Sequence, residues 1–317
     1  MSLPIHLPAS APATDPPAHD ALTRFVFEQA AVRGALVSLD TASRAILDAH
    51  PYPPALRRVL AELLAASALL ASTLKFSGSL IVQLQGDGPV RLLVVECNDA
   101  LELRATAQWD AQRTEAFGAD ATLAELAGGA TQGRLVITLD PKGAGTLYQG
   151  IVTLETNSIA GLVEHYLATS EQLASRLSLA TDGGRAAGLL VQRLPEGNAG
   201  NVGNAGQDDS WARASDRVAC LDPVMLLAPG RTDALLAGIF TQDDVRIFRP
   251  KPVSFRCTCS TERVERALRV AGKAEIESIL DERGQVEVTC EFCNRCYAFA
   301  PAEARALFVP AGSAVWH

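Results

Sequence analysis

The sequence lacks a long uninterrupted apolar run and an excess of basic charge. Its most apolar stretch, from about Val59 to Phe76, contains Glu62, Lys75 and several hydroxyl side chains, so it is too short and too mixed to cross a bilayer. The net charge of −8 repels phosphate backbones, which makes nucleic acid a poor default partner. We therefore expect a cytoplasmic protein that binds neither membranes nor nucleic acid.

Two further kinds of signal are missing. The first twenty residues have neither the basic n-region nor the apolar h-region of a secretory signal, and their Pro and Ala content predicts a disordered arm over 1–20. The chain also has no readable Ser-His-Asp group, paired-carboxylate motif or P-loop, so we expect no enzyme. The sequence GDGP at 86–89 lies between two strand-like segments and indicates a hairpin rather than a phosphate-binding loop.

The composition is that of an ordinary globular protein, with 48% hydrophobic and 20% charged residues among 317. A chain of this size has ample material for a core, so any dependence on metal should be local. We predict an α+β fold with a mixed sheet-and-helix core domain over 21–194. A helical linker over 195–254 and a small zinc-binding module over 255–317 follow it.

Hydrophobic periodicity predicts the elements of the core domain. Two prolines, Pro53 and Pro54, precede a helical pattern over 55–73 whose leucines give a wide apolar face, which predicts a central core helix. The pattern further predicts an opening segment at 21–33, a helix at 159–170, and strands at 79–85, 89–97, 101–109, 135–139, 148–154 and 187–194.

The second half of the chain changes character. Residues 195–214 are rich in Gly, Asn and Asp, which predicts a flexible linker or surface loop. Short apolar helices are predicted from Asp222 and from Thr232, and helices this short are stable only when they lie on another surface. In the module the pattern predicts helices at 261–270, 274–280 and 302–308 and a strand at 286–289.

Seven cysteines are present, and five of them lie within forty residues near the C-terminus. In an intracellular chain such clustering indicates metal or redox chemistry. Cys257 and Cys259 form a C-x-C pair, and thirty residues later Cys290 and Cys293 form a C-x-x-C knuckle. Four sulfurs in two close pairs suit one tetrahedral zinc ion at about 2.3 Å per bond. We therefore predict a zinc site rather than four buried structural cysteines.

Two functions are compatible with such a site. A structural zinc ribbon commonly binds RNA or the ribosome, but residues 254–317 carry eight Lys or Arg against nine Asp or Glu and so have no basic stripe. The alternative is a redox switch, because thiolates react with peroxide and a neighbouring thiolate then resolves the sulfenic acid to a disulfide. Both the Cys257–Cys259 and the Cys290–Cys293 pair are local enough for this reaction.

Energetics favour the switch. A structural zinc ion contributes roughly 10–16 kcal/mol of apparent binding energy in small modules. A module of about sixty residues has only a few kcal/mol of stability of its own. Loss of zinc should therefore unfold the module outright.

Several segments resemble the heat shock protein 33 family of redox-regulated bacterial holdases. The most telling are FRCTCS at 255–260 and CEFCNRCY at 290–297. The resemblance covers nearly the whole chain from about residue 20. It extends to FEQAAVRG at 27–34, LAELLAASALLASTLKFSG at 60–78, VQLQGDGP at 82–89, YQGIV at 148–152 and SEQL at 170–173.

The resemblance implies an ATP-independent chaperone that is inactive when it is reduced and zinc-bound. Oxidation would form the disulfides Cys257–Cys259 and Cys290–Cys293, release the single zinc ion, and unfold the module together with the linker at 195–254. The apolar surface exposed in this way would hold unfolding client proteins during oxidative stress. The oxidised form would act as a homodimer.

The chain departs from the family pattern in two places. Cys296 follows Cys293 by three residues and could be a spare thiol, an alternative ligand or a competing disulfide partner. We interpret it as an accessory thiol, a bystander close to the site. The linker also contains NAGNVGNAG, which looks like an insertion. Cys97 lies at a strand end and is interpreted as a core or edge cysteine, whereas Cys220 in the linker could be oxidised in stress but is interpreted as a bystander.

Overall fold

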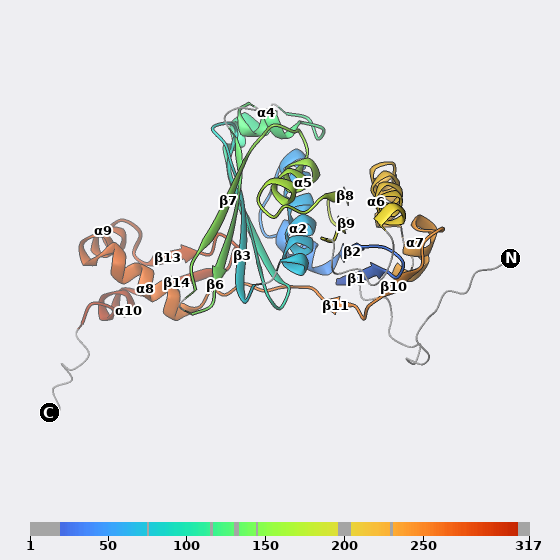
Figure 1. Cartoon of the computed structure of the whole chain (residues 1–317). Coiled ribbons are helices and arrows are strands. Elements are labelled where there is room, and N and C mark those ends of the chain that lie inside the picture. The colour runs from blue at the N-terminus through green and yellow to red at the C-terminus, as the bar shows by residue number, and fades with distance from the viewer. Residues whose placement is uncertain are drawn as a thin grey trace. The chain divides into compact units, whose positions relative to one another are not determined.

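The computed structural model describes residues 20–309 except for 75, 115–116, 130–132, 144, 196–203 and 229–230 (Figure 1). The arm predicted at 1–20 and the segment NAGNVGNAG thus lie largely outside the described residues. The chain divides into two compact units, here called the core unit (Met1–Arg256) and the cysteine unit (Cys257–His317). No helix in the described ranges is both long and apolar enough to cross a membrane.

Two six-stranded sheets form the framework of the core unit. The first sheet, sheet A, consists of β1 (Ala21–Phe27), β2 (Val32–Leu39), β8 (Ser175–Thr181), β9 (Ala186–Arg193), β10 (Val245–Ile247) and β11 (Lys251–Pro252). Its order is β10-β1-β2-β9-β8, β11 also pairs with β1, and every pair is antiparallel. Strands from the two ends of the core unit are therefore neighbours in one sheet.

The second sheet, sheet B, contains the strand run that the sequence predicted. Its strands are β3 (Gly78–Gln85), β4 (Val90–Asn98), β5 (Glu102–Trp109), β6 (Arg134–Pro141), β7 (Tyr148–Thr153) and β12 (Ser254–Phe255). The order is β12-β5-β4-β3-β6-β7. All neighbours are antiparallel except β12, which runs parallel to β5. The predicted hairpin at GDGP is confirmed as the β3–β4 connection.

The central helix α2 (Pro54–Thr73) lies between the two sheets, with α5 (Ile159–Thr169) beside it (Figure 1). Thirteen of its twenty residues are buried, and they point to all sides of the helix. A helix that is apolar all round is one that is covered on every side, which confirms the predicted core helix. Shorter helices complete the unit at α1 (Thr41–Leu47), α3 (Ala111–Thr114) and α4 (Leu123–Ala127).

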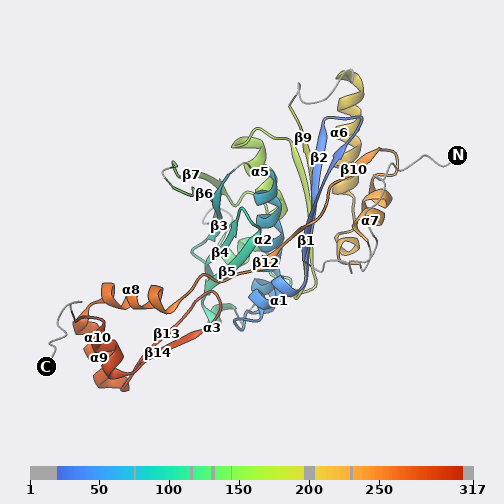
Figure 2. The same ribbon diagram turned by 90° about the horizontal axis from the view of Figure 1, so that it is seen from below.

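The linker helices cover the opposite face of sheet A, and Figure 2 shows them on that side. They are α6 (Asn204–Ala219), the 3-10 helix η1 (Pro223–Leu227) and α7 (Thr232–Ile239). The prediction of a flexible linker or surface loop over 195–214 is wrong from Asn204 onward. Trp211, Ala214 and Val218 recur at helical spacing and pack on the sheet, and this contact stabilises a helix that composition alone disfavours.

One apolar cluster, the linker cluster, joins these helices to sheet A. Phe240 is 2% exposed, and its ring centroid lies 5.6 Å from that of Phe25 and 5.1 Å from that of Phe27. The other buried members are Val32, Leu36, Ala180, Ala187, Leu189, Val191, Ala214, Val218, Leu226, Leu236 and Ile239. The linker thus covers an apolar face that would otherwise meet water.

The last residues of the core unit are held by short strands. After β10 and β11, strand β12 pairs with β5, and the N–H of Arg256 donates to the carbonyl of Leu103 at 2.9 Å. The guanidinium of Arg256 also forms an ion pair with Glu102 at 2.6 Å. The chain is therefore fixed to sheet B up to the residue before Cys257.

The cysteine unit is a small fold of three helices and one hairpin in its described part. Its elements are α8 (Thr261–Ala271), α9 (Lys273–Arg283), β13 (Val286–Thr289), β14 (Cys296–Phe299) and α10 (Pro301–Ala306). Strands β13 and β14 are antiparallel. A compact apolar core joins them, consisting of Val264, Leu268, Ile276, Leu280, Val286, Tyr297, Phe299 and Ala304.

Truncation of Phe240 should loosen the linker without unfolding the core unit. We expect Phe240→Ala to lower the opening free energy of α7 and β10 by roughly 3–5 kcal/mol, because it removes a buried ring from the linker cluster. Hydrogen exchange of the amides in these two elements measures this loss. The matched control is Val224→Ala in the same linker, since Val224 is 68% exposed and should change little. Equal protection in the two variants would contradict the prediction.

Candidate metal centre

The four predicted ligands lie on two short segments of the cysteine unit. Cys257 and Cys259 lie in the extended segment before α8, where Ser260 caps the helix by accepting the N–H of Arg263. Cys290 and Cys293 lie in the turn between β13 and β14. The turn of the hairpin and the segment just before α8 therefore carry one cysteine pair each.

The turn at the second pair has the geometry of a knuckle. The N–H of Cys290 donates to the carbonyl of Arg295 at 2.9 Å, and the N–H of Asn294 donates to the carbonyl of Cys290 at 2.8 Å. Asn294 has a φ of 58°, in the left-handed region that Asn tolerates better than most side chains. This tight reversal directs both sulfurs to one side of the turn.

All four Sγ atoms lie within 4.8 Å of one another. The sulfurs of Cys257 and Cys290 are 3.6 Å apart, and those of Cys259 and Cys293 are 3.5 Å apart. Both distances are far longer than a disulfide bond of about 2.05 Å. Four thiolates around a zinc ion at about 2.3 Å would have their sulfurs about 3.8 Å apart. In donor type, number and spacing the cluster therefore fits a tetrahedral zinc ion.

Tyr297 adds a contact that the sequence did not predict. Its hydroxyl donates a hydrogen bond to Sγ of Cys259 at 3.0 Å, and its ring is 7% exposed. The guanidinium of Arg295 lies 5.2 Å from the ring centroid. A donor that meets one ligand sulfur orients that sulfur and stabilises negative charge on it.

The protonation of the sulfurs reflects this arrangement. Burial disfavours ionisation of Cys259, but hydrogen bonds from Tyr297 and the neighbouring cysteines outweigh it and lower the pKa of Cys259 to about 7. Burial, together with the adjoining sulfur of Cys259, raises the pKa of Cys293 to about 12. Burial likewise raises the pKa of Cys257. Negative charge in the cluster thus concentrates on Cys259, the sulfur that Tyr297 contacts.

The other cysteines lie apart from this cluster. Among the described residues, the group of possible metal ligands contains the four predicted cysteines and leaves out Cys296. Cys296 is exposed on β14, and alternation along the strand points it away from the face that carries Tyr297. Cys97 is buried, and burial raises the pKa of its thiol to about 12, which makes it unreactive. Cys220 is exposed in the linker.

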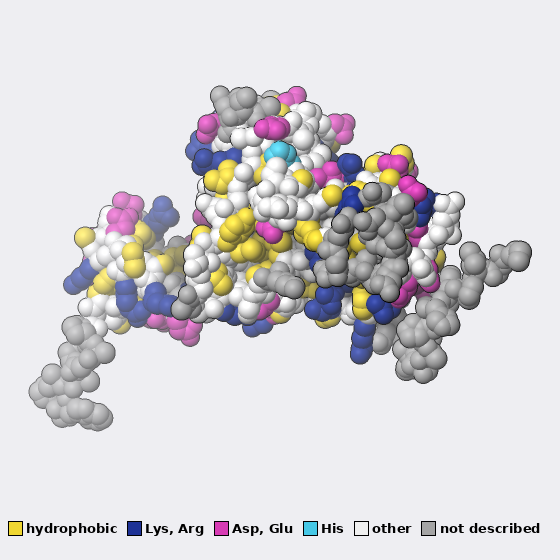
Figure 3. Space-filling view, viewed as in Figure 1, with side chains coloured by type: hydrophobic (Ala, Val, Ile, Leu, Met, Phe, Trp, Pro, Cys, Tyr) yellow, Lys and Arg dark blue, Asp and Glu magenta, His cyan; other side chains and the backbone are white. Residues whose placement is uncertain are grey.

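The surface of the cysteine unit carries both signs of charge. In Figure 3 the visible face of this unit shows Lys or Arg side chains interspersed with Asp or Glu. The unit contains ion pairs between these two kinds of side chain, such as Arg305 with Glu277 and Arg269 with Glu265. This pattern agrees with the balanced charge count of the sequence and presents no uniform basic face in that view.

One signal in the sequence could have identified Tyr297. Val286–Thr289 was predicted as a strand, and the C-x-x-C turn that follows it reverses the chain. A returning strand of alternating Cys, Tyr, Ala and Phe would place Tyr297 and Phe299 on one face, as the structure does. The prediction stopped at the second cysteine pair and therefore missed both β14 and the hydroxyl contact.

Comparison with known proteins agrees with this architecture. Two curated relatives are each named 33 kDa chaperonin. The protein of Methylobacillus flagellatus is 41% identical over 91% of this chain and 94% of its own length. The protein of Chromobacterium violaceum is 42% identical over 92% of this chain and 94% of its own length. The crystal structure of the 33 kDa chaperonin of Thermotoga maritima has the same fold, with a TM-score of 0.72 at 23% identity over 91% of this chain and 98% of that one.

The family model described as Hsp33 protein matches residues 20–300, which include both sheets, the linker helices and all four clustered cysteines. Together with relatives at about 40% identity over nine tenths of the chain, this match shows that the chain belongs to the Hsp33 family.

Proposed function

We propose that this chain is a redox-regulated, ATP-independent holdase that oxidation of the four-cysteine site activates. The observation that carries the proposal is the cluster of four sulfurs within 4.8 Å, on a chain whose family and relatives are named chaperones. In the reduced protein one zinc ion would be held by Cys257, Cys259, Cys290 and Cys293. When bound, zinc keeps these sulfurs as thiolates and joins the two segments that carry them.

The proposed oxidation is a two-electron step for each pair. One sulfur attacks peroxide, the O–O bond breaks, and a sulfenic acid and water form; the second sulfur then displaces water and closes a disulfide. Two thiols and one peroxide thus give one disulfide and two waters. A disulfide sulfur no longer supplies a thiolate, so the site loses its metal.

Cys257–Cys259 and Cys290–Cys293 are the proposed disulfides, although the two shortest sulfur distances run between the motifs. The argument is one of loop length. Closing a disulfide within a motif costs less chain entropy than closing a loop of more than thirty residues once the module has lost its metal. Peptide mapping of the oxidised protein distinguishes the two pairings.

The linker supplies the surface that a holdase needs. The linker cluster buries large apolar side chains on both the linker helices and sheet A, among them Phe25, Phe27 and Phe240. Undocking of the linker would expose both sides of this contact at once. A contiguous apolar surface of this kind binds unfolded chains, and it also suits association of two oxidised copies.

The decisive experiment compares reduced and oxidised protein. We expect peroxide at mildly raised temperature to release about one zinc ion per chain and to convert the protein into a form that suppresses aggregation of a thermally unfolding client. A zinc-sensitive dye and light scattering measure the two effects. Zinc retention, or zinc loss without client protection, would sink the proposal. Nucleic-acid binding that weakens steeply with salt would instead support a structural zinc ribbon.

Removal of zinc by a chelator, without oxidant, should unfold the cysteine unit and leave sheet B folded. The cysteine unit has a core of eight buried apolar residues, whereas the core unit has the far larger cluster around α2. Hydrogen exchange is expected to show lost protection in α8, α9 and β13 and retained protection in β3 and β4. Retained protection in α8 and α9 after complete metal removal would show that the fold of the unit does not depend on zinc.

Tyr297→Phe should make the site easier to oxidise. The substitution keeps the ring but removes the hydroxyl that donates to Cys259, so this sulfur becomes more nucleophilic. We expect the zinc-loaded variant to lose thiols to peroxide roughly three- to tenfold faster. This factor corresponds to part of the free energy of one charge-assisted hydrogen bond. Thiol titration over time measures the rate. The control is Tyr148→Phe on β7, for which an unchanged rate is expected; equal rates in both variants would contradict the role of Tyr297.

A further inference from the structure

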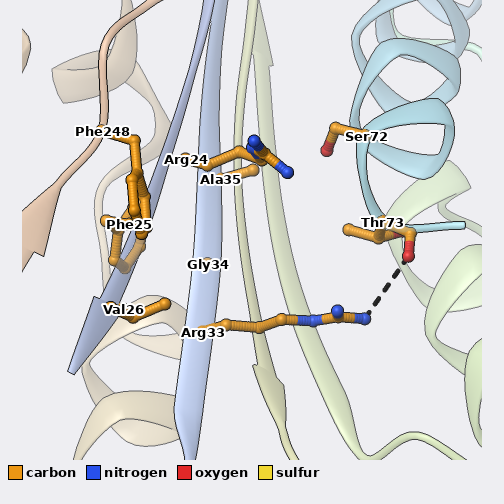
Figure 4. Close-up of a pocket in the computed structure, with 9 residues that line it drawn as sticks. All are labelled: Arg24, Phe25, Val26, Arg33, Gly34, Ala35, Ser72, Thr73 and Phe248. Carbon is orange, nitrogen blue, oxygen red and sulfur yellow. Dashed lines mark hydrogen bonds between the residues drawn. The ribbon is translucent and has the colours of Figure 1, made fainter. Parts of the chain in front are cut away.

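A pocket with two arginines in its lining lies in the core unit, on the face of sheet A that carries α2. It is a pocket of about 250 Å³ beyond the C-terminal end of that helix. Figure 4 shows the side chains of Arg24 and Arg33 extending from β1 and β2 toward Ser72 and Thr73. Phe248, which follows β10, forms part of the wall.

Strand register explains why both arginines line the same pocket. Val26 on β1 pairs with Arg33 on β2, and Arg24 lies two residues away along β1, so all three side chains share one face. The N–H of Phe248 donates to the carbonyl of Arg24 at 2.9 Å, which fixes the linker beside β1. The Arg24 guanidinium lies 6.0 Å from the Phe248 ring centroid.

The two arginines have few partners of their own. Nε of Arg33 donates to Gln192 at 3.0 Å, and one Nη donates to the carbonyl of Thr73 at 3.5 Å. A guanidinium has five N–H donors, so three of them remain available. In the described part of the chain neither Arg24 nor Arg33 forms an ion pair with a carboxylate.

The positive charges of Arg24 and Arg33 on this face contrast with the net charge of −8 of the whole chain. The nearby Arg246 on β10 is neutralised by Glu28 at 3.0 Å, which leaves Arg24 and Arg33 as two uncompensated cations. Burial lowers the pKa of Arg33, and the charge of Arg24 lowers it further. Two like charges held together at a partly buried site raise the free energy of the protein, and an anion between them removes that penalty.

We propose that this pocket binds the phosphate group of a small organic phosphate, held by the guanidinium groups of Arg24 and Arg33. A phosphate carries up to two negative charges and accepts paired N–H bonds from planar guanidinium groups, so it matches two arginines better than a single carboxylate does. Val26, Ala35 and Phe248 supply apolar wall for an organic substituent. The volume lies just below the range of about 300–1,000 Å³ typical of larger ligands, which indicates a small one.

Bound phosphate would also hold the linker in place. Phe248 belongs to the segment at 195–254 that undocks in the proposed function, and this regulatory part of the inference rests on that proposal. Because the ligand contacts β1, β2 and the Phe248 wall together, it binds the docked form and not the undocked one. Occupancy therefore raises the amount of oxidation that activation requires.

Binding is tested on the full-length, reduced, zinc-loaded protein by calorimetry with AMP, ribose 5-phosphate, inorganic phosphate and acetate. We expect saturable binding of AMP or ribose 5-phosphate, weaker binding of inorganic phosphate, and none of acetate. Arg24→Gln should weaken binding roughly ten- to a hundredfold, as loss of a charge-assisted pair does. Arg33→Lys, which keeps the charge but not the planar fork, should weaken it as well.

The matched control is Arg91→Gln, which removes one exposed positive charge from β4 in sheet B and should leave binding unchanged. Failure of both organic phosphates to saturate at millimolar concentration would overturn the proposal. Equal weakening by Arg91→Gln and Arg24→Gln would also overturn it, because the attraction would then be non-specific.

The regulatory part has its own readout. In the reduced protein, ligand should slow hydrogen exchange across 245–252 in the wild type but not in Arg24→Gln. Peroxide activation should be delayed by ligand in the same pattern. Calorimetry and exchange do not involve oxidation, so they test the site even if the chain proves not to be redox-activated. Binding without any slowing of exchange across 245–252 would refute the regulatory part alone.

Discussion

Four sulfur atoms that lie within 4.8 Å of one another form the contact around which the cysteine unit is arranged. They join the segment before α8 to the hairpin β13–β14, two parts of the chain separated by more than thirty residues. Four thiolates this close would repel one another without a cation, and the apolar core of the unit has eight buried residues in its described part. With the proposed zinc ion in this site, folding of the unit would be coupled to the chemical state of its thiols.

Under the proposed function, the attachment of the linker would let this change spread. Its side chains pack firmly in the linker cluster, but its strands are short: β10 has three residues, and β11 and β12 have two each. Short edge strands contribute few ladder hydrogen bonds and open at low free energy. The ion pair of Arg256 with Glu102 is largely exposed on the arginine side and so adds little. Apolar burial thus holds the linker, and the same buried surface becomes available when the linker opens.

Hydrophobic periodicity predicted the helices and strands in which each face has the same environment, core or solvent, along its whole length. Helix α2 and strands β3 to β7 fall within a few residues of the predicted ranges, and the cysteine spacing predicted the cluster itself. The failures share a cause. Helix α6 depends on packing of Trp211, Ala214 and Val218 against sheet A, and β10 to β12 are strands only because distant edges of the sheets accept them. Tyr297 and the Arg24–Arg33 pair likewise owe their roles to strand register.

Both proposed sites adjoin the C-terminal end of the linker. The sulfur cluster begins at Cys257, directly after the anchored Arg256, whereas the arginine pocket includes Phe248 a few residues earlier. If the linker opens as one cooperative segment, stabilising contributions at both sites would add to the same free energy of docking. A ligand present at ten times its Kd would add about 1.4 kcal/mol, which lowers the open population about tenfold. A stabilisation of this size is small beside the roughly 10–16 kcal/mol of zinc binding energy that the proposed oxidation would remove, so it would delay opening after oxidation rather than prevent it. It is large enough to suppress spontaneous opening in the reduced protein. In the proposed scheme oxidation would therefore open the linker, and the anion pocket would set how tightly the linker is closed before oxidation.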